Sequence, residues 1–139
     1  MSRVLMDTGP LVAYLQANEQ YHDWTVKTFS ALRPPFHTCE PVLTEAAFLI
    51  ESHGGDADDL LDLVERSLIQ LSFELADDLP RVRQLMRRYR DLPMSLADAC
   101  LVRMSERYTD CLVVTLDNDF RIYRRHDRKN IPTLMPSEK

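Results

Sequence analysis

Apolar residues along this chain form short continuous runs, and these alternate with longer segments in which apolar positions recur every three or four residues. Short runs flanked by turn residues are typical of strands buried on both faces, whereas the wider spacing is typical of helices. The predicted strands are residues 3–6, 36–39, 69–73, 111–115 and 131–134. The first predicted helix begins at Pro10. Further helices are predicted over residues 21–32, 41–52, 56–68, 79–89 and 95–107, and a basic helical segment follows Asp119.

Short apolar strands that alternate with helices predict a mainly parallel sheet with helices packed on both faces. The expected fold is therefore an α/β three-layer sandwich built on a short sheet. The chain has 139 residues, enough for one core, and shows no internal repeat, low-complexity tract or linker. We expect a single domain spanning residues 1–139.

Charge is distributed unevenly along the chain. The 17 Lys and Arg residues and 22 Asp and Glu residues give a net charge of −5, which argues against a uniformly basic surface for nucleic acid. Residues 1–79, however, carry 4 basic and 14 acidic side chains, while residues 80–139 carry 13 basic and 8 acidic ones. The second part is net positive and remains compatible with binding to RNA phosphates.

The cysteines and the apolar runs bear on the cellular compartment. The three cysteines are odd in number and have no C-x-x-C spacing, which argues against a disulfide framework or a zinc knuckle. The first apolar run is closed by Asp7, unlike a secretory signal, and no apolar stretch reaches the ~18 residues of a membrane span. We expect a cytoplasmic protein with reduced thiols and no membrane partner.

Two carboxylates directly follow predicted strands. Asp7 follows the first strand and Asp117 follows the strand at 111–115, and open α/β sheets bind ligands beyond the carboxyl ends of their strands. Either residue alone fits a turn equally well, because Asp hydrogen-bonds nearby backbone groups and caps helices. Asp119 is expected to cap the basic helical segment that follows it.

Two further acids lie on predicted helices. Helical spacing places Asp98 between Leu101 and Val102, on a face directed into the protein, where a carboxylate needs a partner or a cation. The alternative is a capping box with Ser95, which explains the spacing but not the apolar flanks, so we favour a functional role. Glu45 lies at the border of an apolar face, and alone it would be interpreted as a solvated edge residue.

Four carboxylates at one edge of the sheet would repel one another, and a divalent cation is the usual way to stabilise such a cluster. Oxygen ligands favour Mg²⁺ or Mn²⁺ over zinc. The four histidines are scattered through the sequence and form no pair with metal-ligand spacing. A hard divalent cation is therefore the expected cofactor.

Four short motifs resemble the PIN-domain ribonuclease family, and in particular the VapC toxins of VapBC toxin–antitoxin systems. In family order they are D-T-G-P-L-V-A-Y-L at 7–15, T-E-A-A at 44–47, S-L-A-D-A-C at 95–100 and T-L-D-N-D-F at 115–120. Because the four extend in order along the whole chain, the resemblance is fairly specific. It implies the PIN-like form of the α/β sandwich.

The resemblance also implies a metal-dependent endoribonuclease. The metal, Mg²⁺ or Mn²⁺, would activate a water that cleaves the RNA phosphodiester bond, leaving 5′-phosphate and 3′-hydroxyl ends. A cognate antitoxin and a second copy of the chain, forming a homodimer, are the implied protein partners. The implied catalytic acids and metal ligands are Asp7, Glu45, Asp98 and Asp117. Asp119 is a further ligand if the cluster is wider, and Thr8 and Thr115 are supporting polar groups.

Basic residues follow Asp117 closely in the sequence. We expect them to contact RNA phosphates beside the metal, although a solvated face or a protein interface fits them equally well. A second basic stripe on the helix at 79–89 is expected to be a solvated face. Aromatic residues near these segments are sparse, so no base stacking is predicted. The first group comprises Arg121, Arg124, Arg125, Arg128 and Lys129, and the second comprises Arg83, Arg87 and Arg90.

Other classes of protein fit part of this pattern. Aspartyl phosphoryl transfer also uses an Asp after a first strand, but Gly9 occupies the position of the second acid of a D-x-D pair. A non-catalytic module for RNA or protein interaction would keep the same fold, as would a stand-alone PIN-type nuclease without an antitoxin. The complete set of acids favours an enzyme over the interaction module.

Overall fold

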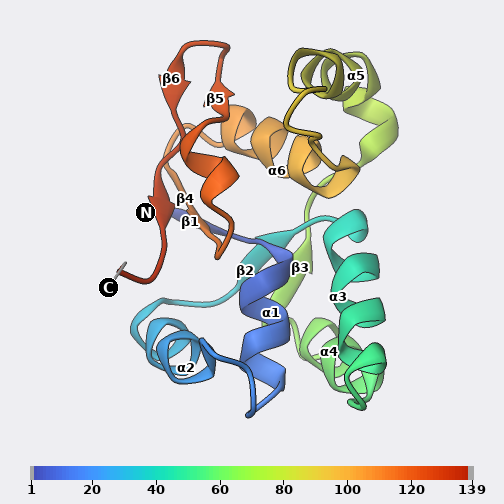
Figure 1. Ribbon diagram of the computed structural model, residues 1–139, viewed down its shortest axis with the longest axis vertical. Helices are drawn as coiled ribbons and strands as arrows, with labels where there is room; N and C mark the ends of the chain where they lie inside the picture. The colour runs from blue at the N-terminus through green and yellow to red at the C-terminus, as the bar shows by residue number, and fades with distance from the viewer. Residues whose placement is uncertain (1, 138–139) are drawn as a thin grey trace.

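The computed structural model describes residues 2–137, which contain a five-stranded sheet (Figure 1). Every neighbouring pair of strands in this sheet is parallel, so the predicted parallel sheet is confirmed. The spatial order of the strands is β3-β2-β1-β4-β7. The strands are β1 (Arg3–Met6), β2 (Phe36–Thr38), β3 (Ile69–Leu71), β4 (Cys111–Val114) and β7 (Thr133–Leu134).

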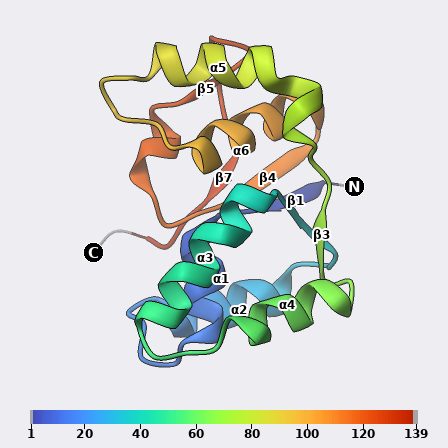
Figure 2. The ribbon, with the colours of Figure 1, turned by 90° about the vertical axis from the view of Figure 1, so that its right-hand side faces the viewer.

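Helices cover both faces of the sheet (Figure 2). α5 and α6 lie on one face and α1, α2 and α4 on the other, while α3 packs beside α1 and also contacts α6. The three-layer α/β sandwich is therefore confirmed. No helix in residues 2–137 is both long and apolar enough to cross a bilayer. The helices are α1 (Thr8–Leu15), α2 (His22–Ala31), α3 (Glu40–Ser52), α4 (Ala57–Glu65), α5 (Leu79–Arg88) and α6 (Leu96–Arg107).

The two central strands consist of the apolar residues expected of a sheet buried on both faces. Leu5 and Met6 of β1 lie opposite Val113 and Val114 of β4, and all four are fully buried. In the sheet, β1 lies between two strands. β2, the next strand along the chain, pairs with it on one side, and β4 pairs with it on the other. Because the strand order reverses between β1 and β4, their carboxyl ends border the crevice where open α/β sheets bind ligands.

The basic segment that follows β4 is not a helix, contrary to the prediction. A short 3-10 helix, η2 (Asn118–Arg121), leads into an antiparallel hairpin of β5 (Arg124–Arg125) and β6 (Lys129–Asn130). His126 and Asp127 in the hairpin turn have positive φ angles, which a right-handed helix does not accommodate. Few apolar residues occur in this segment, so its pattern did not distinguish a hairpin from a helix.

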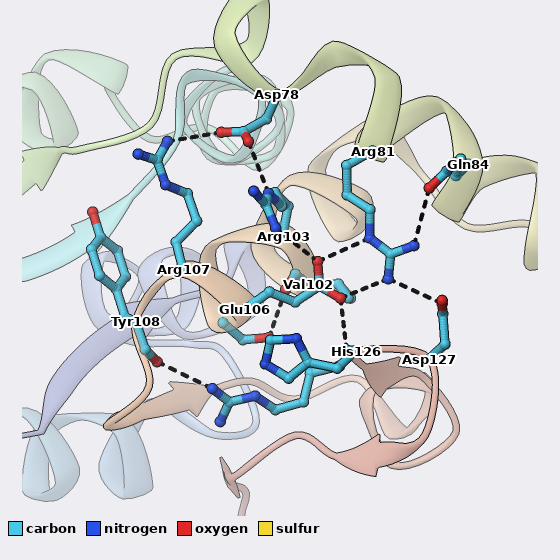
Figure 3. A network of polar contacts seen from close by, with 12 residues as sticks. Asp78, Arg81, Gln84, Val102, Arg103, Glu106, Arg107, Tyr108, His126 and Asp127 are labelled. Carbon is cyan, nitrogen blue, oxygen red and sulfur yellow. Dashed lines mark hydrogen bonds and ion pairs between the residues drawn. The ribbon is translucent and has the colours of Figure 1, made fainter.

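A network of ion pairs joins α5, α6 and the β5–β6 hairpin (Figure 3). At its centre, the Glu106 side chain is 1% exposed and accepts hydrogen bonds from Arg81 at 2.6 and 3.0 Å. It also accepts the backbone N–H of His126 at 2.7 Å and a 3.3 Å bond from Arg103. Burial alone would raise the pKa of Glu106, but the bonds from Arg81 and His126 outweigh burial and the pKa lies below its ordinary value. The hairpin is thus attached to the C-terminal part of α6.

Candidate active site

Asp7 lies at the carboxyl end of β1 and is the N-cap of α1. Its Oδ1 accepts a hydrogen bond from the backbone N–H of Thr8 at 2.8 Å, and its Oδ2 accepts one from the hydroxyl of Thr115 at 2.6 Å. Because of this cap, the helix begins at Thr8 rather than at Pro10 as predicted. Asp7 is 5% exposed, and a carboxylate in such a position requires partners.

Thr115 connects Asp7 with a second acid. The Thr115 hydroxyl is fully buried just after β4, and its oxygen accepts the backbone N–H of Asp117 at 3.0 Å while it donates to Asp7. Asp117 in turn caps η2 by accepting the backbone N–H of Asp119 at 2.9 Å. The cap that we expected at Asp119 is therefore supplied by Asp117, and Asp119 lies in the first turn of η2.

Asp98 forms the capping box that was its alternative interpretation. The Asp98 N–H donates to Ser95 Oγ at 3.0 Å, and the Ser95 N–H donates to Asp98 Oδ2 at 3.4 Å. The same Oδ2 accepts a hydrogen bond from the hydroxyl of Tyr123 at 3.0 Å. These contacts fix the Asp98 carboxyl group at the first turn of α6. There, the charge of Asp98 raises the pKa of Asp7, and the charge of Asp117 raises the pKa of Asp98.

Five predicted acids influence one another electrostatically. Burial raises the pKa of Asp7 to about 7, and the charges of Asp98 and Asp117 add to the rise. Burial also raises the pKa of Asp98, as does the charge of Asp117, although hydrogen bonds oppose the rise. Burial and the charges of Asp98 and Asp117 raise the pKa of Glu45 on α3. Slight burial and the charge of Asp117 raise the pKa of Asp119. We call these five residues the acidic cluster.

The chemistry of the acidic cluster bears on whether it can hold a divalent cation. Within residues 2–137, no three His, Cys, Asp or Glu side chains already form a set that could hold a metal. The donors are nevertheless all oxygens whose mutual repulsion a hard cation relieves. The hydroxyl of Thr8, next to Asp7, is buried and has no hydrogen-bond partner among the described residues. In their chemistry, these oxygen donors suit a hard divalent cation.

Comparison with known proteins identifies the family. A family model for the PIN domain matches residues 4–125. This chain belongs to the PIN domain family. It is similar to Ribonuclease VapC26 of Mycobacterium tuberculosis, with 26% identity over 127 residues that are 88% of each protein. The crystal structure of Mycobacterium tuberculosis VapC20, described as a Sarcin-Ricin loop cleaving toxin, has the same fold. It matches with a TM-score of 0.70 and 18% identity, over 84% of this chain and 91% of that one.

The basic residues of this PIN domain differ in their access to solvent. Arg121 and Arg128 are exposed, and Arg124 is half-buried and donates to backbone carbonyls of η2 and of the residues after it. Arg125 is buried, and its guanidinium donates to two backbone carbonyls just after α6 at 3.3 Å. The expectation that Arg125 contacts RNA is therefore corrected, because a buried guanidinium bonded to carbonyls does not reach a phosphate.

Tyr123 is a residue of the site that the sequence did not indicate. It is fully buried, with its ring against Phe120 at 5.2 Å and Tyr89 at 5.1 Å between centroids, and its hydroxyl donates to Asp98. The only signal in the sequence was an aromatic residue within a strongly basic segment. That segment was predicted as a basic helical stretch, and this prediction gave no reason for a buried tyrosine.

The raised pKa of Asp7 predicts how the stability of the metal-free protein depends on pH. The pKa is about 7 in the folded chain against an ordinary value of 3.8, so the folded state holds a proton that the unfolded state has already released. Stability should therefore fall as the pH rises through this window. In a chelator, we expect a lower melting temperature at about pH 8 than at about pH 5, and a weaker dependence in Asp7→Asn. A melting temperature that rises over this range would contradict the assignment.

Proposed function

We propose that this PIN domain is an endoribonuclease that depends on Mg²⁺ or Mn²⁺ and cleaves RNA phosphodiester bonds with an activated water. The observation that carries the proposal is the acidic cluster, whose acids follow β1 and β4 or lie on α3 and α6. There, Asp7 and Asp117 share one hydrogen-bonding partner, Thr115. The similarity to Ribonuclease VapC26 supports nuclease chemistry.

Asp7, Glu45, Asp98 and Asp117 are the proposed catalytic acids, and together with Asp119 they would hold the cation. When bound, the cation polarises the scissile phosphate and lowers the pKa of a bound water. Glu45 is exposed, whereas the other four acids are buried or half-buried, so Glu45 is the carboxylate best placed to exchange a proton with solvent.

Hydrogen bonds from neighbouring residues keep these acids in position. The single hydroxyl of Thr115 links the Asp7 carboxylate to the backbone N–H of Asp117. The Ser95 N–H and the Tyr123 hydroxyl both donate to Oδ2 of Asp98. Such supporting contacts reduce the reorganisation that ligand binding requires. The exposed Arg121 and Arg128 are the proposed contacts to RNA phosphates.

We also propose that the protein is the toxin of a toxin–antitoxin pair and acts as a homodimer in the cytoplasm. The relative VapC20 is described as a toxin, and VapC26 bears a related name. A stand-alone PIN-type nuclease and a non-catalytic interaction module are the competing functions, and activity and growth assays separate them.

Cleavage of a structured RNA by the purified chain in Mg²⁺ or Mn²⁺ tests the enzymatic proposal. The wild type and Asp59→Asn, which alters an exposed acid of α4, should cleave at the same rate. Asp98→Asn should be slower by more than about 100-fold, because a ligand of the cation is lost. Equal, measurable rates for all three proteins would refute catalysis by the acidic cluster, whereas no cleavage by any of them would favour the interaction module.

Expression in a bacterial host tests the proposed role as a toxin. The wild-type chain should arrest growth, the Asp98→Asn chain should not, and co-expression of a small protein encoded beside it should restore growth. If a chain that cleaves RNA in the test tube is harmless in cells, the stand-alone nuclease is the better description.

Tyr123→Phe should weaken cation binding without destroying the fold. The substitution keeps the ring contacts but removes the 3.0 Å hydrogen bond to Asp98. We expect the Mn²⁺ concentration for half-maximal cleavage to rise about tenfold, with a matching loss of Mn²⁺ affinity by calorimetry. Tyr89→Phe is the control. It removes a tyrosine hydroxyl that accepts the Arg124 N–H at 2.9 Å instead of donating to Asp98. Unchanged Mn²⁺ affinity in Tyr123→Phe would exclude the positioning role.

A further inference from the structure

Two cysteines from distant parts of the chain are in contact inside the core. Cys39 directly precedes α3 and Cys100 lies on α6, and these two helices pack against each other. The thiol of Cys39 donates a hydrogen bond to the sulfur of Cys100. Both side chains are fully buried and both are free thiols. The proposed ribonuclease chemistry uses neither of them.

The third cysteine has a different partner. Cys111 lies on β4, and its thiol donates to the backbone carbonyl of Ser105 at 3.7 Å. All three cysteines lie within residues 2–137, and among them Cys39 and Cys100 are the pair whose thiols bond to each other. Cys111 therefore serves as an internal control for any chemistry of the pair.

Two sulfur atoms in hydrogen-bond contact need only a small movement to reach the ~2.05 Å of a disulfide bond. Hydrogen peroxide supplies the oxidation in two steps. One sulfur loses its proton and attacks a peroxide oxygen, which gives a sulfenic acid and a hydroxide that takes up the proton. The second sulfur then attacks the sulfenic acid, forms the S–S bond and releases water. Two thiols thus lose two protons and two electrons, and one peroxide becomes two waters.

We propose that Cys39 and Cys100 form a modification site, at which hydrogen peroxide produces a reversible disulfide between α3 and α6. Both sulfurs are buried, so oxidation follows local opening of the fold and is slower than at an exposed thiol. Once one sulfur has reacted, its partner is already in contact and completes the bond. A small dithiol such as dithiothreitol reverses the modification by thiol–disulfide exchange. Disulfides of this transient kind are the ones that occur in reducing compartments.

The disulfide joins two helices that carry acids of the acidic cluster. Glu45 lies on α3 six residues after Cys39, and Asp98 lies on α6 two residues before Cys100. Shortening the sulfur–sulfur distance shifts the start of α3 relative to α6, and with it Glu45 relative to Asp98. This consequence rests on the proposed function. The displaced carboxylates hold the cation less tightly, and RNA cleavage by the oxidised chain slows at least about tenfold.

Peptide mapping of the wild-type chain tests the modification directly. The chain is treated with hydrogen peroxide, its remaining thiols are blocked with N-ethylmaleimide, and it is digested with trypsin without reductant. Trypsin places the three cysteines in separate peptides, residues 28–66, 91–103 and 108–121. The first two should be joined and the third should carry the blocking group, and dithiothreitol should separate the joined pair. Three unlinked peptides, or a link to Cys111, would overturn the proposal.

Thermal unfolding is a second readout that needs no RNA. The oxidised wild type should melt roughly 10 °C above the reduced chain, because a cross-link that closes a long loop restricts the unfolded state. Cys111→Ser should show the same rise, and Cys100→Ser should show none. If Cys100→Ser does not fold, the peptide map of the wild type still decides. An equal rise in Cys100→Ser would assign the effect to another oxidation and contradict the proposal.

Cleavage rates separate failure of this inference from failure of the proposed function. After removal of peroxide, the oxidised wild type should cleave RNA slowly and recover with dithiothreitol, whereas Cys100→Ser should cleave equally fast before and after treatment. A linked chain that cleaves at the reduced rate overturns the effect on the acidic cluster. An active chain that never forms the link overturns the modification site and leaves the ribonuclease intact. A chain that forms the link but cleaves RNA in neither state overturns the proposed function alone.

Discussion

Asp7→Asn is expected to abolish RNA cleavage while leaving the fold at least as stable as the wild type at about pH 8. Asp7 is buried, its pKa is raised to about 7, and its charge is opposed by Asp98 and Asp117. A neutral side chain of the same shape removes that repulsion, and Asn still caps α1 through its oxygen. It also removes the charged ligand of the cation, so cleavage should fall by more than about 100-fold.

Melting temperature and cleavage rate measured on the same preparation test this pair of effects. Asp59→Asn, on the exposed face of α4, is the control, and it should change neither quantity. An Asp7→Asn protein that is folded and cleaves RNA at the wild-type rate would remove Asp7 from the mechanism. An Asp7→Asn protein that is inactive because it has unfolded would contradict the predicted stability, since Asn retains the cap of α1.

Glu106→Ala should be the most destabilising single change in the network of Figure 3. The Glu106 side chain is 1% exposed and is the shared acceptor for Arg81, Arg103 and the His126 N–H. Its removal leaves the His126 N–H without its acceptor and takes one acceptor from each of two guanidinium groups, which keep Asp127 and Asp78 as partners. Breaking a buried pair in this way costs about 3 kcal/mol or more, which lowers the melting temperature by roughly 10 °C.

Asp62→Ala provides the matched surface control. It breaks the Asp62–Arg66 ion pair of 3.0 Å, in which the side chains are 54% and 59% exposed. An exposed pair of this kind contributes less than about 1 kcal/mol, so the melting temperature should change little. If the Glu106 and Asp62 variants were equally stable, the buried network would not hold the β5–β6 hairpin against α6.

The parallel sheet and most helices were predictable because their apolar spacing is determined by burial. Leu5 and Val113 lie in continuous apolar runs, and such runs occur where both faces of a strand are covered. Asp7 and Asp117 were predictable as neighbours for a related reason. Each follows a strand, and adjacent parallel strands end at the same edge of the sheet.

The remaining features depend on contacts between distant segments, which local spacing does not encode. Arg125 looks like an exposed basic residue in the sequence, but the β5–β6 hairpin turns it inward to carbonyls after α6. Tyr123 reaches Asp98 only because the hairpin packs on α6. Trp24 of α2 lines the same cavity as Leu116 and Asn118 after β4, although the two segments lie far apart along the chain.

Restoration of activity by metal tests the central claim, that the acidic cluster holds a divalent cation used to cleave RNA. The purified chain is treated with EDTA, dialysed, and assayed on a structured RNA before and after addition of Mg²⁺ or Mn²⁺, with Asp98→Asn in parallel. We predict no cleavage without metal, full cleavage by the wild type once metal is returned, and none by Asp98→Asn. Cleavage that persists in EDTA, or that Asp98→Asn performs as well as the wild type, would contradict the account.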